Sequence, residues 1–175
     1  MIRTPSLWLT TALVGVCAVQ AQDNPISTNM KQSWNNAKNL LQRMAEKMPE
    51  EDYSFKPTPE MQSFGQRMAH VIGFNMRGCA QVKGEQKNVN LPPTASKADI
   101  LAAMKQANEE CDDVFNSLTD AEGLKTVTGG RGGPRTKIAI LSGTVLEHSQ
   151  EMYGYMAVYL RLKGIVPPSS DRNER

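Results

Sequence analysis

The sequence predicts an all-α fold, a four-helix bundle formed by a single domain, and three observations support this. Four amphipathic segments of similar length repeat apolar residues at steps of three and four, which places those residues on one face of a helix. No segment alternates polar and apolar residues in the way that a half-buried strand does. Aromatic residues make up only 6% of the chain, whereas methionine occurs ten times, a composition that suits helices packed through aliphatic and thioether side chains.

Length and charge exclude some classes of protein. A chain of 175 residues with 39% hydrophobic residues can bury a sizeable core without help from a metal. The formal net charge is +2, and acidic and basic residues are interspersed along the chain. Because no basic stripe is present, we expect no nucleic-acid partner.

The N-terminus has the pattern of a signal peptide. A short positively charged start precedes an apolar run over Leu7–Val19, and small residues stand around Ala21, where signal peptidase cuts. We predict a signal peptide over residues 1–21 and an exported protein, periplasmic or secreted, with no stable membrane span after cleavage. Lipidation at Cys17 is disfavoured, because Val16 stands where a lipoprotein signal needs a small residue.

The first helix is predicted to follow a loose lead-in over residues 23–28 and to end at Pro49. Its apolar line consists of Met30, Trp34, Ala37, Leu41, Met44 and Met48. Three prolines between residues 49 and 60 indicate a connecting loop, which we expect to lay Tyr53 and Phe55 over the end of the bundle.

The second and third helices begin at recognisable caps. The second is predicted to run from Ser63 to Lys83, with His70 on its flank. Its inward line is Phe64, Met68, Val71, Asn75, Cys79 and Val82. The third follows the capping box Ser96–Asp99. Its inward line is Ile100, Met104, Ala107, Cys111, Val114 and Leu118.

Two cysteines remain after signal cleavage, Cys79 and Cys111, and both stand on inward lines. An even number of cysteines in an oxidising compartment favours a disulfide between them. The alternative is that each is a small buried apolar residue. A bridge requires neighbouring helices with Cα atoms about 4.4–6.8 Å apart, which the sequence alone does not supply.

The fourth helix is predicted over Lys137–Lys163, and it carries His148 within an apolar line. That line is Ile138, Leu141, Val145, His148, Met152, Tyr155 and Tyr159. The glycine-rich segment 129–133 ahead of it lacks a preceding strand and a following Gly-Lys-Ser/Thr, so we interpret it as a surface connection and not a phosphate cradle. The bundle should span residues 22–166, followed by a disordered tail over 167–175.

A histidine in an apolar line has two interpretations. His148 is either a metal-binding or catalytic residue, or a core histidine bonded to a backbone carbonyl or a carboxylate. His70 can likewise be a partly exposed surface residue. We interpret Met152 as core filling and Tyr153, Tyr155 and Tyr159 as packing residues, since nothing nearby would lower the pKa of a phenol.

Several short fragments, in their order and spacing, resemble the DinB-like family of four-helix bundles. They are Phe55–Pro59, Ser63–Gln66 leading to Met68–Val71, Gly78-Cys79 before Lys83–Glu85, and His148–Glu151 running through Tyr153-Gly154 to Tyr159–Gly164. The resemblance implies a long crossover between the second and third helices. It also implies a divalent transition metal, such as zinc or nickel, held by three histidines, one from the second helix and two from the fourth.

The resemblance carries over only in part to the residues of this chain. His70 matches the first metal ligand and His148 the second, but the third position is Met152. Methionine is a poor ligand for zinc, nickel or manganese and a reasonable one for Cu(I). Glu151 lies one turn after His148 and is a possible substitute ligand.

Three functions therefore remain open from the sequence. The first is an exported DinB-like bundle with a degenerate His70, His148 and Met152 metal site, acting as a metal-dependent hydrolase or transferase on an unknown small molecule. The second is a non-catalytic binding or structural bundle that lacks a functional metal. The third is Cu(I) handling through the same three residues. A homodimer is also possible, and the sequence identifies neither the substrate nor the reaction.

Overall fold

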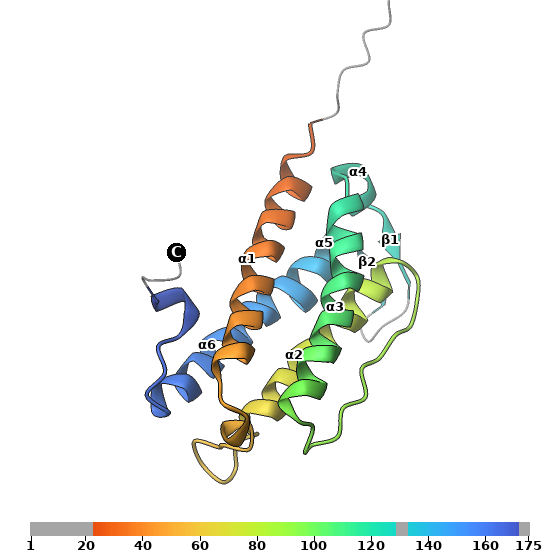
Figure 1. The fold of residues 1–175 in the computed structure, drawn as a ribbon. Coiled ribbons are helices and arrows are strands. Elements are labelled where there is room, and N and C mark those ends of the chain that lie inside the picture. Colours follow the sequence, from red (N-terminus) through yellow and green to blue (C-terminus); the bar gives the residue numbers. More distant parts are fainter. Residues whose placement is uncertain (1–22, 129–132, 172–175) are drawn as a thin grey trace, which may run out of the picture.

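The computed structural model describes residues 23–128 and 133–171, and this part of the chain forms a bundle of four long helical segments (Figure 1). These are α1 (Pro25–Lys47), α2 (Phe64–Val82), α3 (Lys97–Ser117) and a composite fourth segment made of α5 (Lys137–Ile140), a π-helical segment (Leu141–Glu147) and α6 (His148–Leu162). The expected four-helix bundle is confirmed. None of the described helices is long and apolar enough to cross a bilayer, and the expected signal peptide lies outside the described residues.

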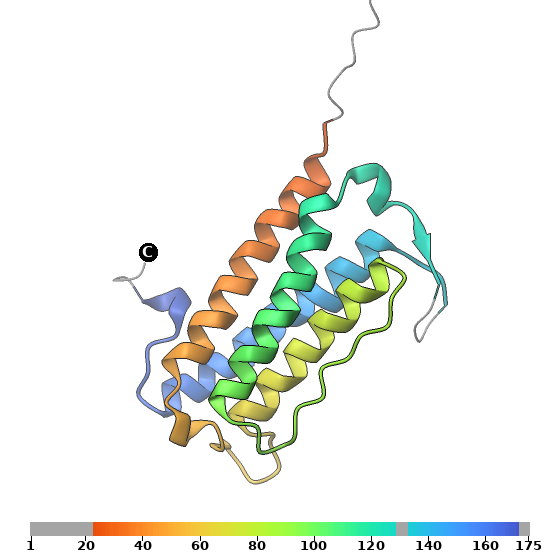
Figure 2. The ribbon, with the colours of Figure 1, turned by 45° about the vertical axis from the view of Figure 1, so that its right-hand side comes forward.

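Helices α2 and α3 run in the same direction, while α1 and α6 run the opposite way (Figure 2). Residues 83–96 connect α2 to α3 and travel back along the length of the bundle. The α2–α3 pair makes the most extensive helix contact in the described structure. The long crossover between these two helices is therefore confirmed.

Helix α1 begins earlier than the sequence suggests. The expected loose lead-in is helical from Pro25, which suits the first helical position because proline lacks an N–H. The carboxylate of Asp120 accepts hydrogen bonds from the backbone N–H groups of Ile26 (3.2 Å) and Ser27 (2.7 Å). A side chain distant in the sequence therefore caps the N-terminus of α1. In the reverse direction, the Asn24 side chain accepts a hydrogen bond from the Asp120 N–H (2.9 Å).

Helices α2 and α3 begin where their caps predict. The Ser63 hydroxyl accepts from the Gln66 N–H (3.2 Å), and the Gln66 side chain accepts from the Ser63 N–H (2.9 Å). Ser96 and Asp99 form the same reciprocal pair, with both bonds at 3.1 Å. Each box satisfies N–H groups that a helix start leaves unpaired.

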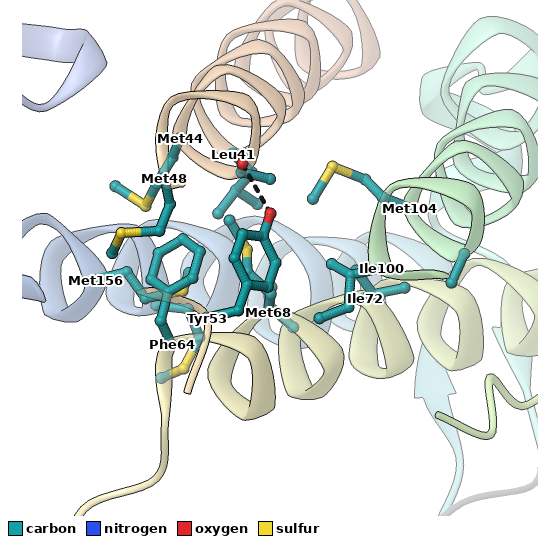
Figure 3. Packing of buried hydrophobic residues seen from close by; sticks show 14 of the residues in the cluster. Leu41, Met44, Met48, Tyr53, Phe64, Met68, Ile72, Ile100, Met104 and Met156 are labelled. Carbon is teal, nitrogen blue, oxygen red and sulfur yellow. Dashed lines mark hydrogen bonds between the residues drawn. The ribbon is translucent and has the colours of Figure 1, made fainter. Parts of the chain in front are cut away.

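Methionines and aromatic rings fill the half of the bundle that contains the α1–α2 loop (Figure 3). The Tyr53 ring packs edge-on against Phe64 with centroids 5.1 Å apart, and its hydroxyl donates to the Ala45 carbonyl (2.7 Å). Phe55 packs similarly against Tyr159, with centroids 6.1 Å apart. The loop thus lays both aromatic rings over the end of the bundle, as expected.

A short hairpin links α3 to the fourth segment. After α4 (Asp120–Gly123), the strands β1 (Thr126–Val127) and β2 (Arg135–Thr136) pair antiparallel, with Thr126 opposite Thr136. Strands of two residues are too short to show alternation in a sequence, which is why they were not predicted. The glycine-rich residues 129–132 between them lie outside the described part of the chain.

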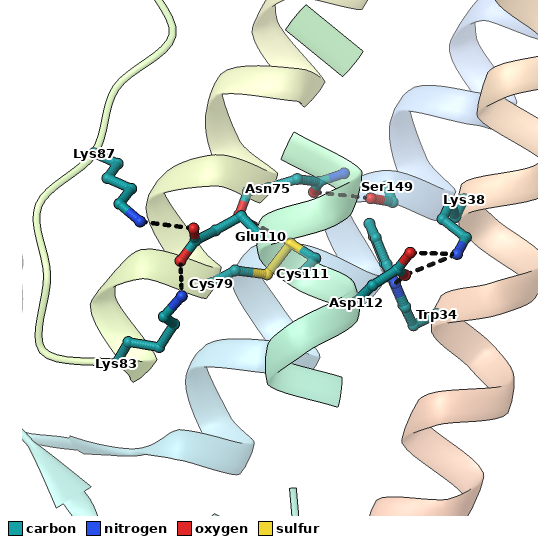
Figure 4. The surroundings of a disulfide bond; sticks show 10 residues. All are labelled: Trp34, Lys38, Asn75, Cys79, Lys83, Lys87, Glu110, Cys111, Asp112 and Ser149. Carbon is teal, nitrogen blue, oxygen red and sulfur yellow. Dashed lines mark hydrogen bonds and ion pairs between the residues drawn. A yellow bond between two sulfur atoms is a disulfide. The ribbon is translucent and has the colours of Figure 1, made fainter. Parts of the chain in front are cut away.

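The second half of the core surrounds a disulfide. Cys79 of α2 and Cys111 of α3 are bonded, with Cα atoms 5.2 Å apart (Figure 4). The predicted bridge is therefore present in the structure. Next to it, the Glu110 carboxylate, only 9% exposed, receives Lys83 Nζ at 2.8 Å and Lys87 Nζ at 2.7 Å.

Three further polar contacts join the helices in this half of the bundle. The Ser149 hydroxyl of α6 donates to Asn75 Oδ1 of α2 (3.1 Å), and both side chains are buried. On the other side of α3, Asp112 accepts from Trp34 Nε1 and from Lys38 Nζ, both at 2.7 Å (Figure 4). Four helical segments are thus cross-linked at one level of the bundle.

The chain after α6 folds back onto the bundle. Residues 167–175 were expected to form a disordered tail, but Pro167 and Pro168 are buried and Pro168–Ser170 forms a 3₁₀ turn. The Tyr153 hydroxyl accepts from the Ser169 N–H (2.8 Å) and holds this turn against α6. The last four residues lie outside the described structure.

Candidate functional site

The fourth segment passes through the π-helical residues Leu141–Glu147 immediately before His148. A π-helix bonds residue i to i+5 and so holds more residues per turn than an α-helix. Beyond it, Ser149 is buried where the sequence predicts His148, and Met156 is buried where it predicts Tyr155. Met152 and Tyr159 are buried as predicted. As a result the His148 side chain lies at the edge, 15% exposed, and Tyr155 is 49% exposed.

A glycine of α2 lets the π-helical segment approach. A Cβ at Gly78 would lie 2.7 Å from Val145 Cγ2, closer than real contacts allow. This position therefore requires glycine for close helix packing. The close approach brings the outer edges of α2 and α6 together, where His70 and His148 stand.

The two histidines that the family resemblance pairs do lie side by side. The ring centroids of His70 and His148 are 5.0 Å apart, with the planes inclined at 65°. Phe74 packs against both, 4.6 Å from the His70 ring and 4.3 Å from the His148 ring. The three rings form one cluster at the α2–α6 edge.

Glu151 contacts His148 as a hydrogen-bond partner. Its Oε2 atom lies 3.3 Å from His148 Nδ1, and its Oε1 atom accepts from the Tyr155 hydroxyl (3.1 Å). His148 Nε2 is buried and has no hydrogen-bond partner within the described part of the chain. Glu151 thus orients the ring, and the other ring nitrogen stays without a hydrogen bond.

Met152, at the third family position, is a core residue only 3% exposed. Its sulfur lies 4.0 Å from Arg67 Nη1, and the Arg67 guanidinium sits over the Tyr155 ring, 5.6 Å from its centroid. Arg67 Nε is buried and unpartnered among the described residues. A guanidinium therefore stands beside the place where the family carries its third histidine.

The charged side chains around His70 and His148 create a positive electrostatic potential at the α2–α6 edge. Burial lowers the pKa of His70 below its ordinary value, and the nearby His148, Arg67 and Arg77 lower it further, against the opposing effect of Glu151. The Arg77 guanidinium lies 4.5 Å from the Phe74 ring centroid. Over residues 23–128 and 133–171, neither arginine forms an ion pair with a carboxylate.

The residues present do not fit the divalent metal that the family resemblance implies. Within the described structure, no three histidine, cysteine, aspartate or glutamate side chains are arranged to hold a metal ion. The available donors are two imidazoles and one thioether, and a guanidinium adjoins the thioether. The nearest carboxylate, Glu151, is hydrogen-bonded to His148 Nδ1 and to the Tyr155 hydroxyl, so a zinc or nickel ion held by the uncharged donors would face the guanidinium. The same guanidinium stands against Cu(I) at Met152.

Comparison with known proteins identifies the family. The family model of the DinB superfamily matches residues 31–156. The chain belongs to the DinB superfamily. No curated protein matches it.

Two solved DinB-like proteins share the fold of this superfamily member. One, from Bacillus cereus, is 20% identical over 81% of this chain and 95% of its own, with a TM-score of 0.66. The other, from Bacillus subtilis, is 21% identical over 82% of this chain and 99% of its own, with a TM-score of 0.65. At these identities the likeness concerns the fold alone.

Three residues of the site were not singled out from the sequence of this DinB-superfamily chain: Arg67, Phe74 and Arg77. With His70 they follow one another at steps of three, four and three along α2, so they share one helix face. That spacing was the available signal. It does not by itself distinguish a site from the ordinary polar face of an amphipathic helix.

Proposed function

We propose that this DinB-superfamily chain is exported and works as a binding bundle without metal chemistry. The observation that carries the proposal is the Arg67 guanidinium, 4.0 Å from the sulfur of Met152. A fixed positive charge occupies the neighbourhood in which a three-histidine site would hold its metal.

The positive charge is also uncompensated. Arg67 has no carboxylate partner in the described structure, and Glu151 is engaged by His148 and Tyr155. A bound dication would therefore face the guanidinium at short range in a partly buried place, where charge repulsion is only weakly screened. This favours a metal-free site.

One observation favours the other candidate, a metal-dependent hydrolase or transferase. Metal-binding histidines usually donate a hydrogen bond from their second ring nitrogen to a carboxylate. Glu151 contacts His148 Nδ1 in that way, and His148 Nε2 has no hydrogen-bond partner among the described residues. In that case His70 and His148 would supply two of the ligands, and a third would have to come from outside the described donors.

Metal titration separates these two functions. The mature protein, produced without a histidine tag, is titrated calorimetrically with zinc and with nickel. We expect no binding at micromolar metal. The variant Met152→His/Arg67→Gln restores the third imidazole and removes the cation, so it should bind zinc tightly, while the matched control Met152→Leu/Arg67→Gln should not. Tight zinc binding by the parent would replace this proposal with the metal-dependent enzyme.

Export has an independent test. Expression of the full chain in a bacterial host, followed by mass measurement of the protein in the periplasm or medium, should give a product that begins at Gln22. Retention of residues 1–21 on a cytoplasmic product would contradict export.

A further inference from the structure

We infer that the outer face of α6 binds a second copy of this chain, with the two α6 helices packed antiparallel across a two-fold axis. The face is apolar, although the solvent-facing side of a bundle helix is normally polar. Six large apolar side chains are exposed in the described structure, and four of them lie between residues 155 and 166. These four are Tyr155, Val158, Leu162 and Val166. Exposed apolar side chains that gather in one place mark an interaction surface, whereas scattered ones do not.

Tyr155, Val158 and Leu162 form a line along the outer face of α6, which we call the outer seam. They follow one another at steps of three and four, so they share one face of the helix. Each is about half exposed, at 49%, 54% and 58%. This spacing is the one by which two helices pack side by side over several turns. Helix α6 therefore has one apolar face inside the bundle and a second one that is open to a partner.

The charges beside the outer seam favour a second copy and fix its direction. Glu151 stands four residues before Tyr155, and Arg161 flanks the other end of the seam. Arg161 forms no ion pair with a described residue. The ten residues from 151 to 161 span about 15 Å of helix. In an antiparallel pair each Glu151 comes level with Arg161 of the other copy, whereas a parallel pair would bring like charges together. The face is thus complementary to itself, as a two-fold interface requires.

Gly154 gives a second indication. It lies two turns before Arg161 on the same flank of the outer seam, and a Cβ at this position would meet nothing within 4 Å. Packing within the chain therefore does not require glycine here, although glycine is less favourable than alanine in the interior of a helix. In the antiparallel pair, Arg161 of the second copy crosses this flank. The missing side chain leaves room for it to reach Glu151.

The size of the face sets the expected affinity. One pair of helices buries less than the roughly 1,200–2,000 Å² of a stable complex, so we expect a dissociation constant on the order of 10–100 μM. The mature protein with its disulfide intact is measured by sedimentation equilibrium from about 1 to 500 μM, which brackets that range. We expect a monomer–dimer equilibrium. A monomer at all these concentrations would overturn the inference.

A lysine on the outer seam should prevent association. Val158→Lys places two cations close to the two-fold axis, and we expect it to weaken the dimer by more than about tenfold. The matched control is Ile26→Lys, which makes the same change on α1 at a side chain of similar exposure, 47%. It should alter the affinity by less than about threefold. Equal losses in the two variants would overturn the assignment to α6.

Exchange of the two charges tests the direction of packing. Arg161→Glu should weaken the dimer about tenfold, because Glu151 of each copy then meets a second carboxylate. The double variant Glu151→Lys/Arg161→Glu restores opposite charges and should return the affinity to within about threefold of the parent. A dimer that Val158→Lys disrupts but the double variant does not restore would overturn the antiparallel arrangement.

Gly154→Ala should affect the single chain and the dimer in opposite directions. The added methyl group meets nothing within the chain, and alanine favours the helix, so the urea midpoint of the monomer should rise. The same methyl group obstructs the second copy and should weaken the dimer about tenfold. Unchanged association would contradict the close approach at this flank.

A lipid surface is the other possible occupant of an apolar helix face. Cosedimentation with vesicles of equal parts phosphatidylcholine and phosphatidylglycerol tests it. We expect the protein to stay in the supernatant, because Glu151 next to the outer seam would be repelled by the anionic vesicle surface. Vesicle binding that Val158→Lys abolishes, by a protein that stays monomeric in solution, would assign the face to lipid and overturn the inference.

Discussion

The two sides of helix α2 differ in how completely their polar groups are paired. On the inward side, Asn75 receives the Ser149 hydroxyl and Cys79 is bonded to Cys111. On the outer edge, His70 and Arg77 have no ion-pair or hydrogen-bond partner in the described structure. We call the inward side of α2, where the polar groups are paired, the closed side, and the outer edge with His70 and Arg77 the open side.

This difference separates stability from recognition. A satisfied buried polar network fixes one arrangement of the helices, and removing a member leaves its partner without a hydrogen bond. An edge with open donors and acceptors contributes little to folding, but it keeps those groups available for a ligand. Substitutions on the closed side should therefore lower the free energy of unfolding, and substitutions on the open side should change only binding.

The largest expected effect is the loss of the disulfide. The bridge joins residues separated by 32 positions. For a loop of this length, the chain-entropy relation gives about 3.7 kcal/mol of stabilisation through restriction of the unfolded chain. The double variant Cys79→Ala/Cys111→Ala should lose that much free energy of unfolding in urea titrations. A loss below about 1 kcal/mol would mean that this half of the bundle is held by packing alone.

Glu110→Gln should have the next largest effect. The carboxylate is 9% exposed and receives two lysines, so the neutral amide would weaken two charged hydrogen bonds. We expect a loss of about 1–3 kcal/mol at pH 7, towards the lower end because both lysines can reach water. Urea unfolding measures it, with the exposed Glu109→Gln as the matched control, which should change stability by less than about 0.5 kcal/mol.

The same carboxylate predicts a pH dependence. Burial raises the pKa of Glu110, but Lys83 and Lys87 lower it by more, and it stays below its ordinary value of 4.5. A pKa depressed by folding gives stability that is present above the unfolded value and lost as the pH falls through the folded value. The difference in stability between the parent and Glu110→Gln should therefore shrink below pH 4.5. A constant difference across the acid range would contradict the ion pair.

Ser149→Ala should cost less. It removes the donor to Asn75 Oδ1 and leaves that buried acceptor unpaired, at about 1–2 kcal/mol. Its exposed neighbour supplies the control, since Gln150→Ala should be almost neutral. If both variants unfold at the same urea concentration, the Ser149–Asn75 bond does not stabilise the closed side.

Arg67→Met should have the smallest effect on folding. The variant keeps the aliphatic part of the side chain and loses the guanidinium contacts to Met152 Sδ and the Tyr155 ring, but no described ion pair is lost. The free energy of unfolding should stay within about 0.5 kcal/mol of the parent. A loss above about 2 kcal/mol would show that Arg67 belongs to the stabilising network, and the division between the two sides of α2 would fail.

Much of the fold could be predicted because its signals are local. The inward line of α2 from Phe64 to Val82 is periodic, and the caps at Ser63 and Ser96 lie within one turn of the helices they start. The start of α1 could not be predicted, since its cap Asp120 is 93 residues from Ser27. Sequence periodicity reports what a helix buries, but not which distant side chain closes its end.

The site was predictable only in part for the same reason. The family resemblance places His70 and His148 in one site, and the two rings lie next to each other in the structure. The shift that leaves His148 at an edge depends on a π-helical segment packed against Gly78, a contact between distant parts of the chain. The approach of Arg67 to Met152 spans 85 residues and has no local signature.

The disulfide also encloses the long crossover. Residues 83–96 leave α2 after Cys79 and return to α3 before Cys111, so a protease that cuts this exposed connection produces two pieces that remain covalently joined. The helices on both sides keep their partners across the cut, and the pieces cannot diffuse apart. A chain nicked at this connection can therefore persist as one folded molecule.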